Sequence, residues 1–385
     1  MTTGDKPYRL YRGGRVKGKV PGIPRPEPDG RRPGGPILPT ERRRRPRRRT
    51  AILLGVLLII LFVVVWLVAG YLAVRKGVRE ANDRLPQGAR AALASQDGLL
   101  MNQPTTIALF GTDHDAAIEG RASARRSDSI MLLRTDPSHN RIAYLSIPRD
   151  LRVDIPGHST SKINAAFQLG GPMLALRAVR NFTGIPVNHV VVVDFADFTE
   201  LVDALGGITV NNPTPILSNR FDCPYSTEER CARWEGWRFR KGEIHLDGYH
   251  ALVYSRVREN RLDPGETDIT RGERQQRVMQ AIMSKIASFS TLARLPLMGE
   301  DLAKPLATDL STEQFLQLGW RKFRADDGST LHCRLGGEPS SYGGESILVP
   351  SEDNRNVISM FLGASAPQPP PRGQPFAPGC TIGRP

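Results

Sequence analysis

The hydrophobic pattern of this chain begins with one uninterrupted apolar run, from Ala51 to Val74, that contains no charged residue. As a helix the run would extend about 36 Å, which is enough to cross a bilayer with some tilt. The arginine-rich block 42–49 precedes it, so the positive-inside bias predicts a single-pass helix with a cytoplasmic N-terminus and an extracytoplasmic C-terminal part. A cleaved signal peptide is the alternative, but its apolar core would be shorter.

Beyond residue 104 the apolar positions alternate between strand-like and helix-like patterns. The stretches TTIALFGTD, SDSIMLLRTD and RIAYLSIPRD predict strands, the last two joined by the turn DPSHN. The continuous apolar run HVVVVDF is typical of a buried strand, and ITVNNP and 331–335 predict further strands. Helices are predicted at 164–182, 197–205, 247–254, 268–289, 312–323 and 353–361. This alternation predicts an α/β fold of the αβα type, with a central mixed β-sheet flanked by helices.

Composition divides the chain into five predicted segments. They are a basic, disordered cytoplasmic tail at 1–50, the transmembrane helix at 51–74, a stalk or linker at 75–103, a single extracytoplasmic domain at 104–363, and a Pro-rich C-terminal tail at 364–385. The first segment is assigned as disordered because it is rich in Pro, Gly and Arg and has no apolar period.

The net charge of +14 is concentrated in the N-terminal tail. Residues 1–50 hold 16 Lys and Arg against 4 Asp and Glu, whereas the remaining chain holds 37 against 35. A nearly neutral folded part gives no reason to expect a nucleic-acid partner, and we expect none. Anionic lipid of the inner leaflet is a sufficient partner for the arginine block.

All four cysteines lie on the predicted outer side of the membrane, and four cysteines allow three disulfide pairings. In one of these, Cys223 with Cys231 would close a short loop, and Cys333 with Cys380 would tie down the end of the chain. A zinc site is the rival interpretation. Disulfides are favoured over it, because no CxxC pair or nearby histidine pattern is present.

The densest group of cationic side chains lies between Tyr254 and Val278. It contains Arg256, Arg258, Arg271, Arg274 and Gln275, with Asp268 among them. The apolar positions that follow recur every three to four residues, so the second half of this stretch predicts a helix. Because the backbone N–H groups and dipole of a helix start favour an anion, the cluster predicts a phosphate site. A solvated patch of surface ion pairs is the alternative.

Acidic residues stand at two neighbouring strand ends. Asp113 and Asp115 follow the first predicted strand, and Asp128 begins the next. Carboxylates in such positions can share Mg²⁺, which also binds substrate phosphate oxygens. Ordinary turn and capping roles are the alternative. Arg149 in SIPRD and Lys162 in SKIN are either part of the same site or surface cations.

The chain lacks the motifs of several enzyme classes. No GxSxG, Walker-type loop or HExxH occurs, and the seven histidines are scattered without ligand spacing. A serine hydrolase or a zinc enzyme is therefore disfavoured. Many arginines with a few aspartates suit phosphoryl transfer between bound partners, where catalysis consists of positioning and charge neutralisation.

The order of these stretches resembles the LytR-CpsA-Psr family over about residues 104–362. The matching motifs are GTD, RSDSIML, SIPRD, KINAAF followed by GG, VDFADFTELVDALGGI, LDGYHALVYSRVR and DITRGERQQ. The short N-terminal tail, the single span and the external domain are similar as well. The resemblance implies an enzyme that moves a glycopolymer from a polyprenyl-pyrophosphate carrier onto peptidoglycan and forms a phosphodiester bond.

The resemblance also implies roles for individual residues. Asp113 and Asp128 would hold Mg²⁺, with Mn²⁺ as the alternative cation. The pyrophosphate would be bound by Arg126, Arg149, Lys162, Arg256, Arg258, Arg271 and Gln275. Catalytic roles would fall to Arg149, Arg258, Asp268 and Arg271. Asp268 would take the proton from the attacking muramyl hydroxyl or orient the arginines, and an apolar tunnel between sheet and helices would hold the prenyl chain.

One departure from the family pattern and two other functions stay open. The loop GTDHDAAIEGRASARRSD is long and acidic, so either Asp113 or Asp115 would be the first metal ligand. The same pocket could instead hydrolyse the pyrophosphate and release the lipid carrier. A non-enzymatic, attenuator-type regulator that binds polyprenyl phosphates is the other alternative, but it has no need for both a paired carboxylate site and Asp268.

Overall fold

The computed structural model describes residues 48–96, 99–112, 127–263 and 268–383. The chain separates into two compact units, Met1–Leu57 and Leu58–Pro385. Of the first unit, only the beginning of helix α1 (Arg48–Arg84) lies within the described ranges.

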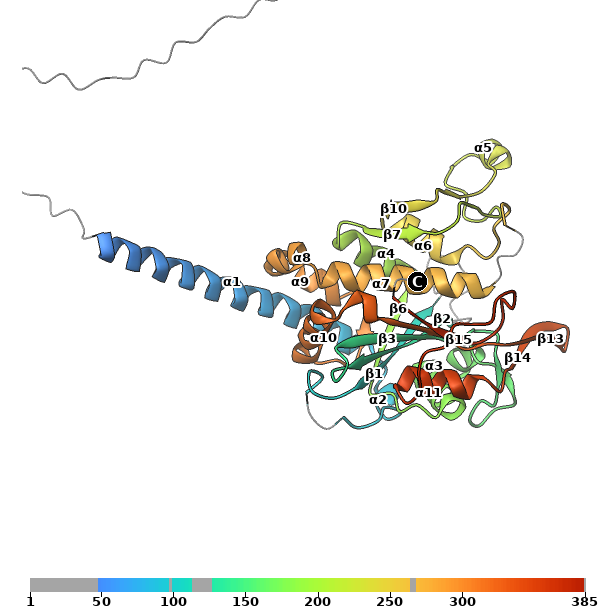
Figure 1. Ribbon diagram of the computed structural model, residues 1–385. Coiled ribbons are helices and arrows are strands. Elements are labelled where there is room, and N and C mark those ends of the chain that lie inside the picture. Colours follow the sequence, from blue (N-terminus) through green and yellow to red (C-terminus); the bar gives the residue numbers. More distant parts are fainter. Residues whose placement is uncertain (1–47, 97–98, 113–126, 264–267, 384–385) are drawn as a thin grey trace, which may run out of the picture. The chain divides into compact units, whose positions relative to one another are not determined.

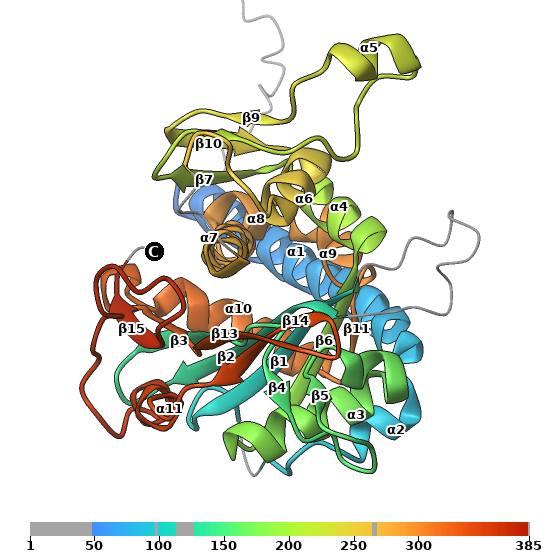
Figure 2. The ribbon, with the colours of Figure 1, turned by 90° about the vertical axis from the view of Figure 1, so that its right-hand side faces the viewer.

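The centre of this unit is a seven-stranded mixed sheet in the order β11–β6–β1–β2–β3–β12–β15 (Figures 1 and 2). Its strands are β1 (Thr105–Thr112), β2 (Ser127–Asp136), β3 (Arg141–Ser146), β6 (His189–Asp194), β11 (Ala307–Thr308), β12 (Leu331–Arg334) and β15 (Gly379–Ile382). β1 runs parallel to β6, and β3 runs parallel to β12. The other pairs are antiparallel, so the predicted mixed sheet is confirmed.

Helices cover both faces of the sheet (Figure 2). One face carries α2 (Gln87–Arg90), α3 (Ala165–Thr183) and α11 (Asn354–Leu362). The other carries α4 (Phe195–Ala204), α6 (Gly248–Arg256), α7 (Asp268–Ile286), α8 (Phe289–Ala293), α9 (Leu295–Ala303) and α10 (Thr312–Arg324). Alternation along β1 explains this division, because Ala108 and Phe110 pack toward α3 while Ile107 packs toward α7 and α10.

Shorter elements lie outside the seven-stranded sheet. They are β4 (Arg152–Val153) paired with β5 (Ser161–Lys162), β7 (Ile208–Asn212) with β10 (Gly242–Leu246), β8 (Ile216–Leu217) with β9 (Arg238–Phe239), β13 (Gly337–Tyr342) with β14 (Glu345–Pro350), helix α5 (Glu228–Arg233) and the 3₁₀ turn η1 (Asp327–Ser329). The helices predicted at 164–182, 247–254, 312–323 and 353–361 are present with ends shifted by one or two residues. Helices α8 and α9, and the hairpin β13–β14, were not predicted.

The segment predicted as a stalk, 75–103, is packed into the domain. Helix α1 continues to Arg84, and Leu85, Ala89 and Ala92 then join the core on the α3 side of the sheet. Two of these three buried positions are alanines, which give a weak apolar signal in the sequence. Among the described residues, α1 is the helix long and apolar enough to cross a membrane, which indicates membrane anchoring.

The segment predicted as a Pro-rich tail, 364–385, also returns to the domain. It ends in β15, which pairs antiparallel with β12 at the edge of the sheet. Disulfides join Cys333 to Cys380 and Cys223 to Cys231, which is one of the three pairings that the sequence allowed. A four-residue edge strand after a proline-rich segment has too short a hydrophobic pattern to be predicted from the sequence. The disulfide from Cys380 to Cys333 explains why this strand lies beside β12.

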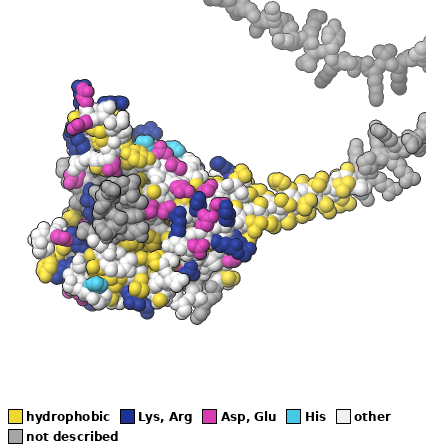
Figure 3. Space-filling view, turned by 180° about the vertical axis from the view of Figure 1, so that it is seen from behind, with side chains coloured by type: hydrophobic (Ala, Val, Ile, Leu, Met, Phe, Trp, Pro, Cys, Tyr) yellow, Lys and Arg dark blue, Asp and Glu magenta, His cyan; other side chains and the backbone are white. Residues whose placement is uncertain are grey.

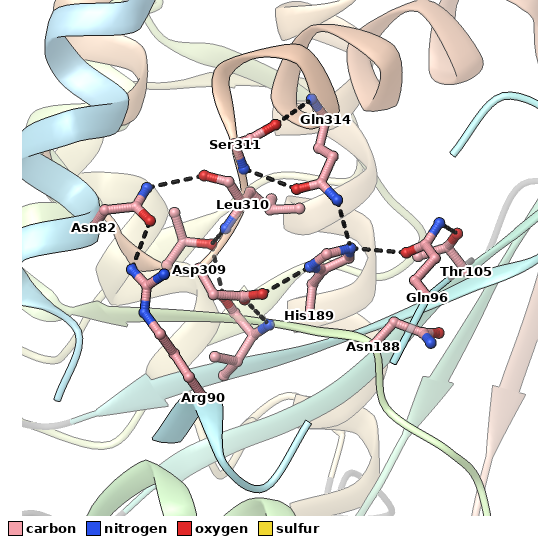
Figure 4. A network of polar contacts seen from close by, with 12 residues as sticks. Asn82, Arg90, Gln96, Thr105, Asn188, His189, Asp309, Leu310, Ser311 and Gln314 are labelled. Atoms are coloured by element: carbon pink, nitrogen blue, oxygen red, sulfur yellow. Dashed lines mark hydrogen bonds and ion pairs between the residues drawn. The ribbon is translucent and has the colours of Figure 1, made fainter. Parts of the chain in front are cut away.

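A polar network attaches α1 and the start of α10 to the sheet (Figure 4). Asn82 donates its side-chain N–H to the carbonyl of Leu310 at 2.9 Å. Asp309 accepts the backbone N–H of Val190 at 2.7 Å and contacts His189 Nδ1 at 2.7 Å. The C-terminal end of α1 is therefore held by hydrogen bonds to the loop between β11 and α10.

We predict that the double variant Cys333→Ser/Cys380→Ser loses stability, because the disulfide closes a loop with a sequence separation of 47 residues. In the chain-entropy view, a loop of this length contributes about 4 kcal/mol, with less expected in practice. Urea unfolding followed by circular dichroism gives the change. The half-buried pair Cys223/Cys231, separated by 8 residues, is the matched control and should cost less. Equal losses for both pairs would contradict the role of β15.

Candidate functional site

A large apolar cavity lies between the sheet and the helices of the α7 side, with a volume of about 540 Å³. The sheet contributes Ile107, Leu109, Met131, Leu133, Val191 and Val193. The helices contribute Phe198, Leu201, Val278, Met279, Ile282, Met283, Ile286, Phe315 and Leu318. This is the position where the prenyl tunnel was expected, although the sequence did not name its lining.

The end of the cavity beside the N-terminal part of α7 is polar and cationic. Arg256, Arg258, Arg271 and Gln275 all line it, and Asn219, Ser129 and Glu259 stand beside them. The first four are predicted phosphate-binding residues, and they come from two neighbouring segments, the end of α6 with the residues that follow it, and α7. The structure therefore brings these four side chains together at one opening.

The contacts between α7 and the C-terminal end of α6 determine where these cationic side chains lie. Arg274 is 2% exposed and donates from Nη2 to the carbonyl O of Val257 at 2.6 Å. Gln275 donates to the carbonyl O of Ser255 at 3.4 Å. Because Val257 caps α6 between Arg256 and Arg258, these contacts fix both arginines beside α7. Arg274 was predicted as a phosphate donor, and it instead serves as a buried clamp.

The two arginines at the end of α6 differ in their surroundings. Arg256 pairs with Asp222 and lies over the rings of Phe195 and Phe221, at 4.6 and 5.7 Å from their centroids. Arg258 is exposed, and within the described ranges it makes no hydrogen bond or ion pair. Arg258 is therefore a cation at the cavity with its donors available to a ligand.

Arg149 and Lys162 form a second group around Asp150. Arg149 Nε lies 3.4 Å from Asp150 Oδ2, and Lys162 Nζ lies 3.4 Å from Asp150 Oδ1 and 3.3 Å from Glu345. Neither lines the large cavity. Arg149 follows β3 by three residues, and α7 approaches the end of β3 so closely that a Cβ on Gly272 would lie 3.1 Å from Ser146 Oγ. The loop with Arg149 thus leaves the sheet beside the start of α7.

The predicted metal ligands fall mostly outside the described residues. Asp113, Asp115 and Arg126 lie there entirely, and so do the side chains of Asp128 and Asp268, whose backbones begin β2 and α7. In the described part of the chain, no three His, Cys, Asp or Glu side chains gather as metal ligands. The register nevertheless pairs Thr112, which precedes Asp113, with Ser127, which precedes Asp128.

Two further carboxylates stand where β6 ends at the cavity. Asp194 lines the cavity and caps α4 by accepting the backbone N–H of Asp197 at 2.9 Å. Burial raises the pKa of the Asp197 carboxyl above its usual value, against the hydrogen bond from Arg84, and the charge of Asp194 adds to the increase. Asp197 therefore keeps its proton to a higher pH than an ordinary aspartate.

A second cavity, of about 270 Å³, lies along another face of α7 and is lined by polar residues of α7 and β12. Its Glu273 accepts from Arg334 Nη1 at 2.6 Å. Burial lowers the pKa of Arg334, and the charge of Glu273 partly offsets this. α7 therefore separates a mainly apolar cavity from a smaller cavity with an internal ion pair.

Comparison with known families gives one family whose profile, LytR_cpsA_psr, matches residues 70–356. The chain is 32% identical over 244 residues to the polyisoprenyl-teichoic acid–peptidoglycan teichoic acid transferase TagV of Bacillus subtilis (strain 168), covering 62% of this chain and 58% of that protein. It is 32% identical over 286 residues to the enzyme named TagU from Enterococcus faecalis (strain ATCC 700802 / V583), covering 74% and 87%. The match thus spans less than two thirds of the first relative and most of the second.

Solved structures share the fold. A crystal structure of B. subtilis TagV has a TM-score of 0.54 and 27% identity, covering 69% of this chain and 99% of that one. The LytR-CPS2A-psr family protein YwtF (TagT), solved with a bound octaprenyl pyrophosphate lipid, has a TM-score of 0.51 and 23% identity, covering 72% and 98%. At this identity the second likeness concerns the fold alone.

We predict that the large cavity binds a single-chain amphiphile with an anionic head, such as dodecyl phosphate, and that Met279→Trp weakens binding. A bulkier side chain in the cavity would exclude part of the chain, and each excluded CH₂ costs about 0.8 kcal/mol, so a loss of about 10–100-fold is expected. Titration calorimetry measures the affinity. Leu169→Trp, at an exposed apolar position on α3, is the control. Unchanged affinity in Met279→Trp would show that the chain binds elsewhere.

Proposed function

This chain belongs to the LytR_cpsA_psr family, and we propose that it transfers a glycopolymer from a polyisoprenyl-pyrophosphate carrier to peptidoglycan. The observation that carries the proposal is one continuous cavity with an apolar body and an arginine-lined end. A carrier lipid has the same two parts, a long apolar chain and a diphosphate. The names of the relatives, polyisoprenyl-teichoic acid–peptidoglycan transferases, support the same reaction.

The geometry of the cavity supports a position for each part of the substrate. The isoprenoid chain lies between α7 and the sheet, where the lining is apolar and includes several methionines that adapt to an irregular chain. The diphosphate lies at the polar end, where Arg258 and Arg271 reach it as planar, bidentate donors. Arg256 and Gln275 add contacts from the same opening.

The chemistry is a displacement at phosphorus. A hydroxyl oxygen of the acceptor glycan attacks the phosphorus that carries the glycopolymer, and a new P–O bond forms. The bond from that phosphorus to the bridging oxygen breaks, and the carrier leaves as polyisoprenyl phosphate. Asp268 accepts the hydroxyl proton, and the arginines neutralise charge that builds up on the diphosphate.

Mg²⁺ is proposed as the cation of this site, with Mn²⁺ as the alternative. Asp128 and either Asp113 or Asp115 would hold it, since carboxylate oxygens are the ligands that these hard cations prefer. The pairing of Thr112 with Ser127 supports this choice, because it brings the residues before Asp113 and Asp128 to adjacent strand ends. When bound, the cation would neutralise phosphate oxygens.

The proposed orientation places the N-terminus in the cytoplasm and the domain outside the membrane. The arginine block before α1 supports it through the positive-inside bias. The two disulfides of the domain agree with an oxidising compartment outside the cytoplasm. Donor lipid and peptidoglycan acceptor are then available on the same side.

Product analysis tests the proposed function against its alternatives. The protein is incubated with a lipid-pyrophosphate glycan, an acceptor glycan and Mg²⁺, and products are identified by mass spectrometry. A joined product with release of lipid phosphate is expected. Free phosphorylated glycan would indicate a hydrolase, and an absence of turnover with bound lipid would indicate a regulator.

We predict that Arg258→Ala lowers kcat/KM for transfer by about 10²–10³-fold, the size of effect seen when a preorganised donor to transition-state charge is removed. Because the Arg258 side chain is exposed, its removal should leave the fold unaffected. Arg261→Ala is the control, since Arg261 is an exposed neighbour that donates to the carbonyl O of Glu235 at 2.9 Å. Wild-type kcat/KM in Arg258→Ala would exclude Arg258 from the diphosphate site.

We predict that Asp128→Asn abolishes binding of Mn²⁺ to the protein, because it removes a charged ligand from the proposed cation site. The readout is the electron paramagnetic resonance signal of free Mn²⁺, which does not depend on turnover. Asp301→Asn, at an exposed position on α9, should bind Mn²⁺ as the wild type does. Comparing Asp113→Asn with Asp115→Asn identifies the second ligand, and full binding in all three site variants would refute the site.

A further inference from the structure

Two short helices after α7 carry large apolar side chains on the surface. Phe289 and Leu292 of α8 are 77% and 45% exposed, and Leu297 of α9 is 85% exposed. Elsewhere α9 is well packed, with Met298 and Leu302 buried in the core. The exposed apolar side chains thus belong to a folded segment that is anchored in the core.

This segment is fixed directly against α1. Trp66 donates its indole N–H to the carbonyl O of Ala293 at 3.3 Å. A Cβ on Gly70 would lie 3.3 Å from the Leu295 side chain, and one on Gly77 would lie 2.3 Å from the backbone O of Glu300. α9 therefore packs backbone to backbone on α1, and this contact requires glycine.

The contact falls where the apolar surface of α1 ends. Large apolar side chains of α1 are exposed from Ile52 to Val68 and again at Leu72, whereas Gly70 and Val74 are buried against the domain. Figure 3 shows hydrophobic side chains covering α1, and a group of Lys, Arg, Asp and Glu on the domain where that cover ends. The run from Ala51 to Gly70 would extend about 30 Å, which matches the hydrocarbon core of a bilayer.

Aromatic residues of α1 lie at the same height along the helix as its contact with α8 and α9. Trp66 and Tyr71 stand near the end of the exposed run, and such residues are enriched where a span leaves the hydrocarbon. Tyr71 donates its hydroxyl to Glu313 Oε1 of α10 at 2.8 Å, so polar contacts begin there. α8 and the start of α9 touch α1 at this level, so a bilayer that α1 crosses would have its surface beside them.

The apolar end of the cavity faces the same region. Ile286, the last residue of α7, lines the cavity and precedes α8 by three residues. Phe315 lines the cavity and also packs against Val74 and Val78 of α1. In Figure 1, α7 extends from the α8 end, beside α1, to the opposite side of the domain. Arg271 and Ile286 are about 22 Å apart along its axis.

We propose that Phe289, Leu292 and Leu297 form a bilayer rim that inserts into the outer leaflet and holds the apolar end of the cavity against the membrane. A lipid chain then enters the cavity from the bilayer without crossing water, and its head reaches the arginines at the other end of α7. The membrane contact follows from the packing on α1, whereas the entry route rests on the proposed function.

Fluorescence of single labelled sites tests the membrane contact in the full chain, reconstituted in phosphatidylcholine–phosphatidylglycerol vesicles. All four native cysteines are in disulfides, so a cysteine introduced as Phe289→Cys or Leu297→Cys can be labelled selectively with an environment-sensitive dye. Leu262→Cys is the control, because Leu262 is 54% exposed on the segment between α6 and α7.

The rim positions should show blue-shifted emission, quenching by nitroxide groups on the acyl chains and protection from aqueous iodide. The control should show the reverse. If iodide quenches the dye at 289 and 297 as strongly as at 262, the bilayer rim is overturned. This result does not depend on catalysis.

The double variant Phe289→Glu/Leu297→Glu tests the entry route. We expect turnover of a long-chain donor embedded in vesicles to fall at least tenfold, with turnover of a water-soluble short-chain donor unchanged. An equal loss on both donors, in a variant with unchanged melting temperature, would overturn the entry route. If the wild-type protein turns over neither donor, the proposed function fails, and the entry route that rests on it fails too, while the labelling result still decides the membrane contact.

Discussion

A single buried hydrogen bond organises the polar end of the cavity. Arg274 of α7 donates to the carbonyl O of Val257, at the C-terminal end of α6, where the helix dipole favours a cation. Loss of this donor would leave a buried carbonyl unsatisfied, at a cost of about 1–3 kcal/mol. It would also leave the Gln275 contact with Ser255 to hold the end of α6 against α7. The convergence of cations from two segments thus depends on one arginine that does not itself face the opening.

The two faces of the sheet differ in packing, because one carries a continuous core and the other a large cavity. On the α3 side, Ala108, Phe110 and Leu132 belong to a continuous core with α3 and α11. On the α7 side, the same strands leave a cavity of about 540 Å³. An empty apolar cavity reduces stability, because its lining lacks partner atoms. Such a space is retained where a ligand chain fills it, and the bilayer rim explains how an insoluble chain reaches it.

The sequence was sufficient for the main strands and helices and for part of the site, for identifiable reasons. The strands around β1 and the helix α7 had clear periodicity, and Arg256, Arg258, Arg271 and Gln275 were recognisable as one group because they lie close along the chain. Arg274 was misassigned because helical spacing alone does not say which side chain turns inward. Arg149 and Lys162 were predicted at the pyrophosphate site, and in the structure they gather around Asp150 without lining the large cavity. Their position depends on the path of the loop that carries Asp150, which is set by tertiary packing.

The segments that the sequence misjudged are those that gain their structure from distant contacts. β15 is an edge strand held by Cys333, and α8 and α9 are short helices whose position depends on glycines of α1. Their apolar residues, such as Leu297, look like ordinary core positions in the sequence. Only their exposure beside the membrane helix distinguishes them.

The most direct test of the account is a crystal structure of the protein with a bound polyprenyl pyrophosphate. We expect the diphosphate between Arg258 and Arg271, and the chain along α7 between Met279 and the sheet, with its tail directed toward Phe315 and α8. A diphosphate bound away from both arginines, or a chain on the α3 side of the sheet, would contradict the account.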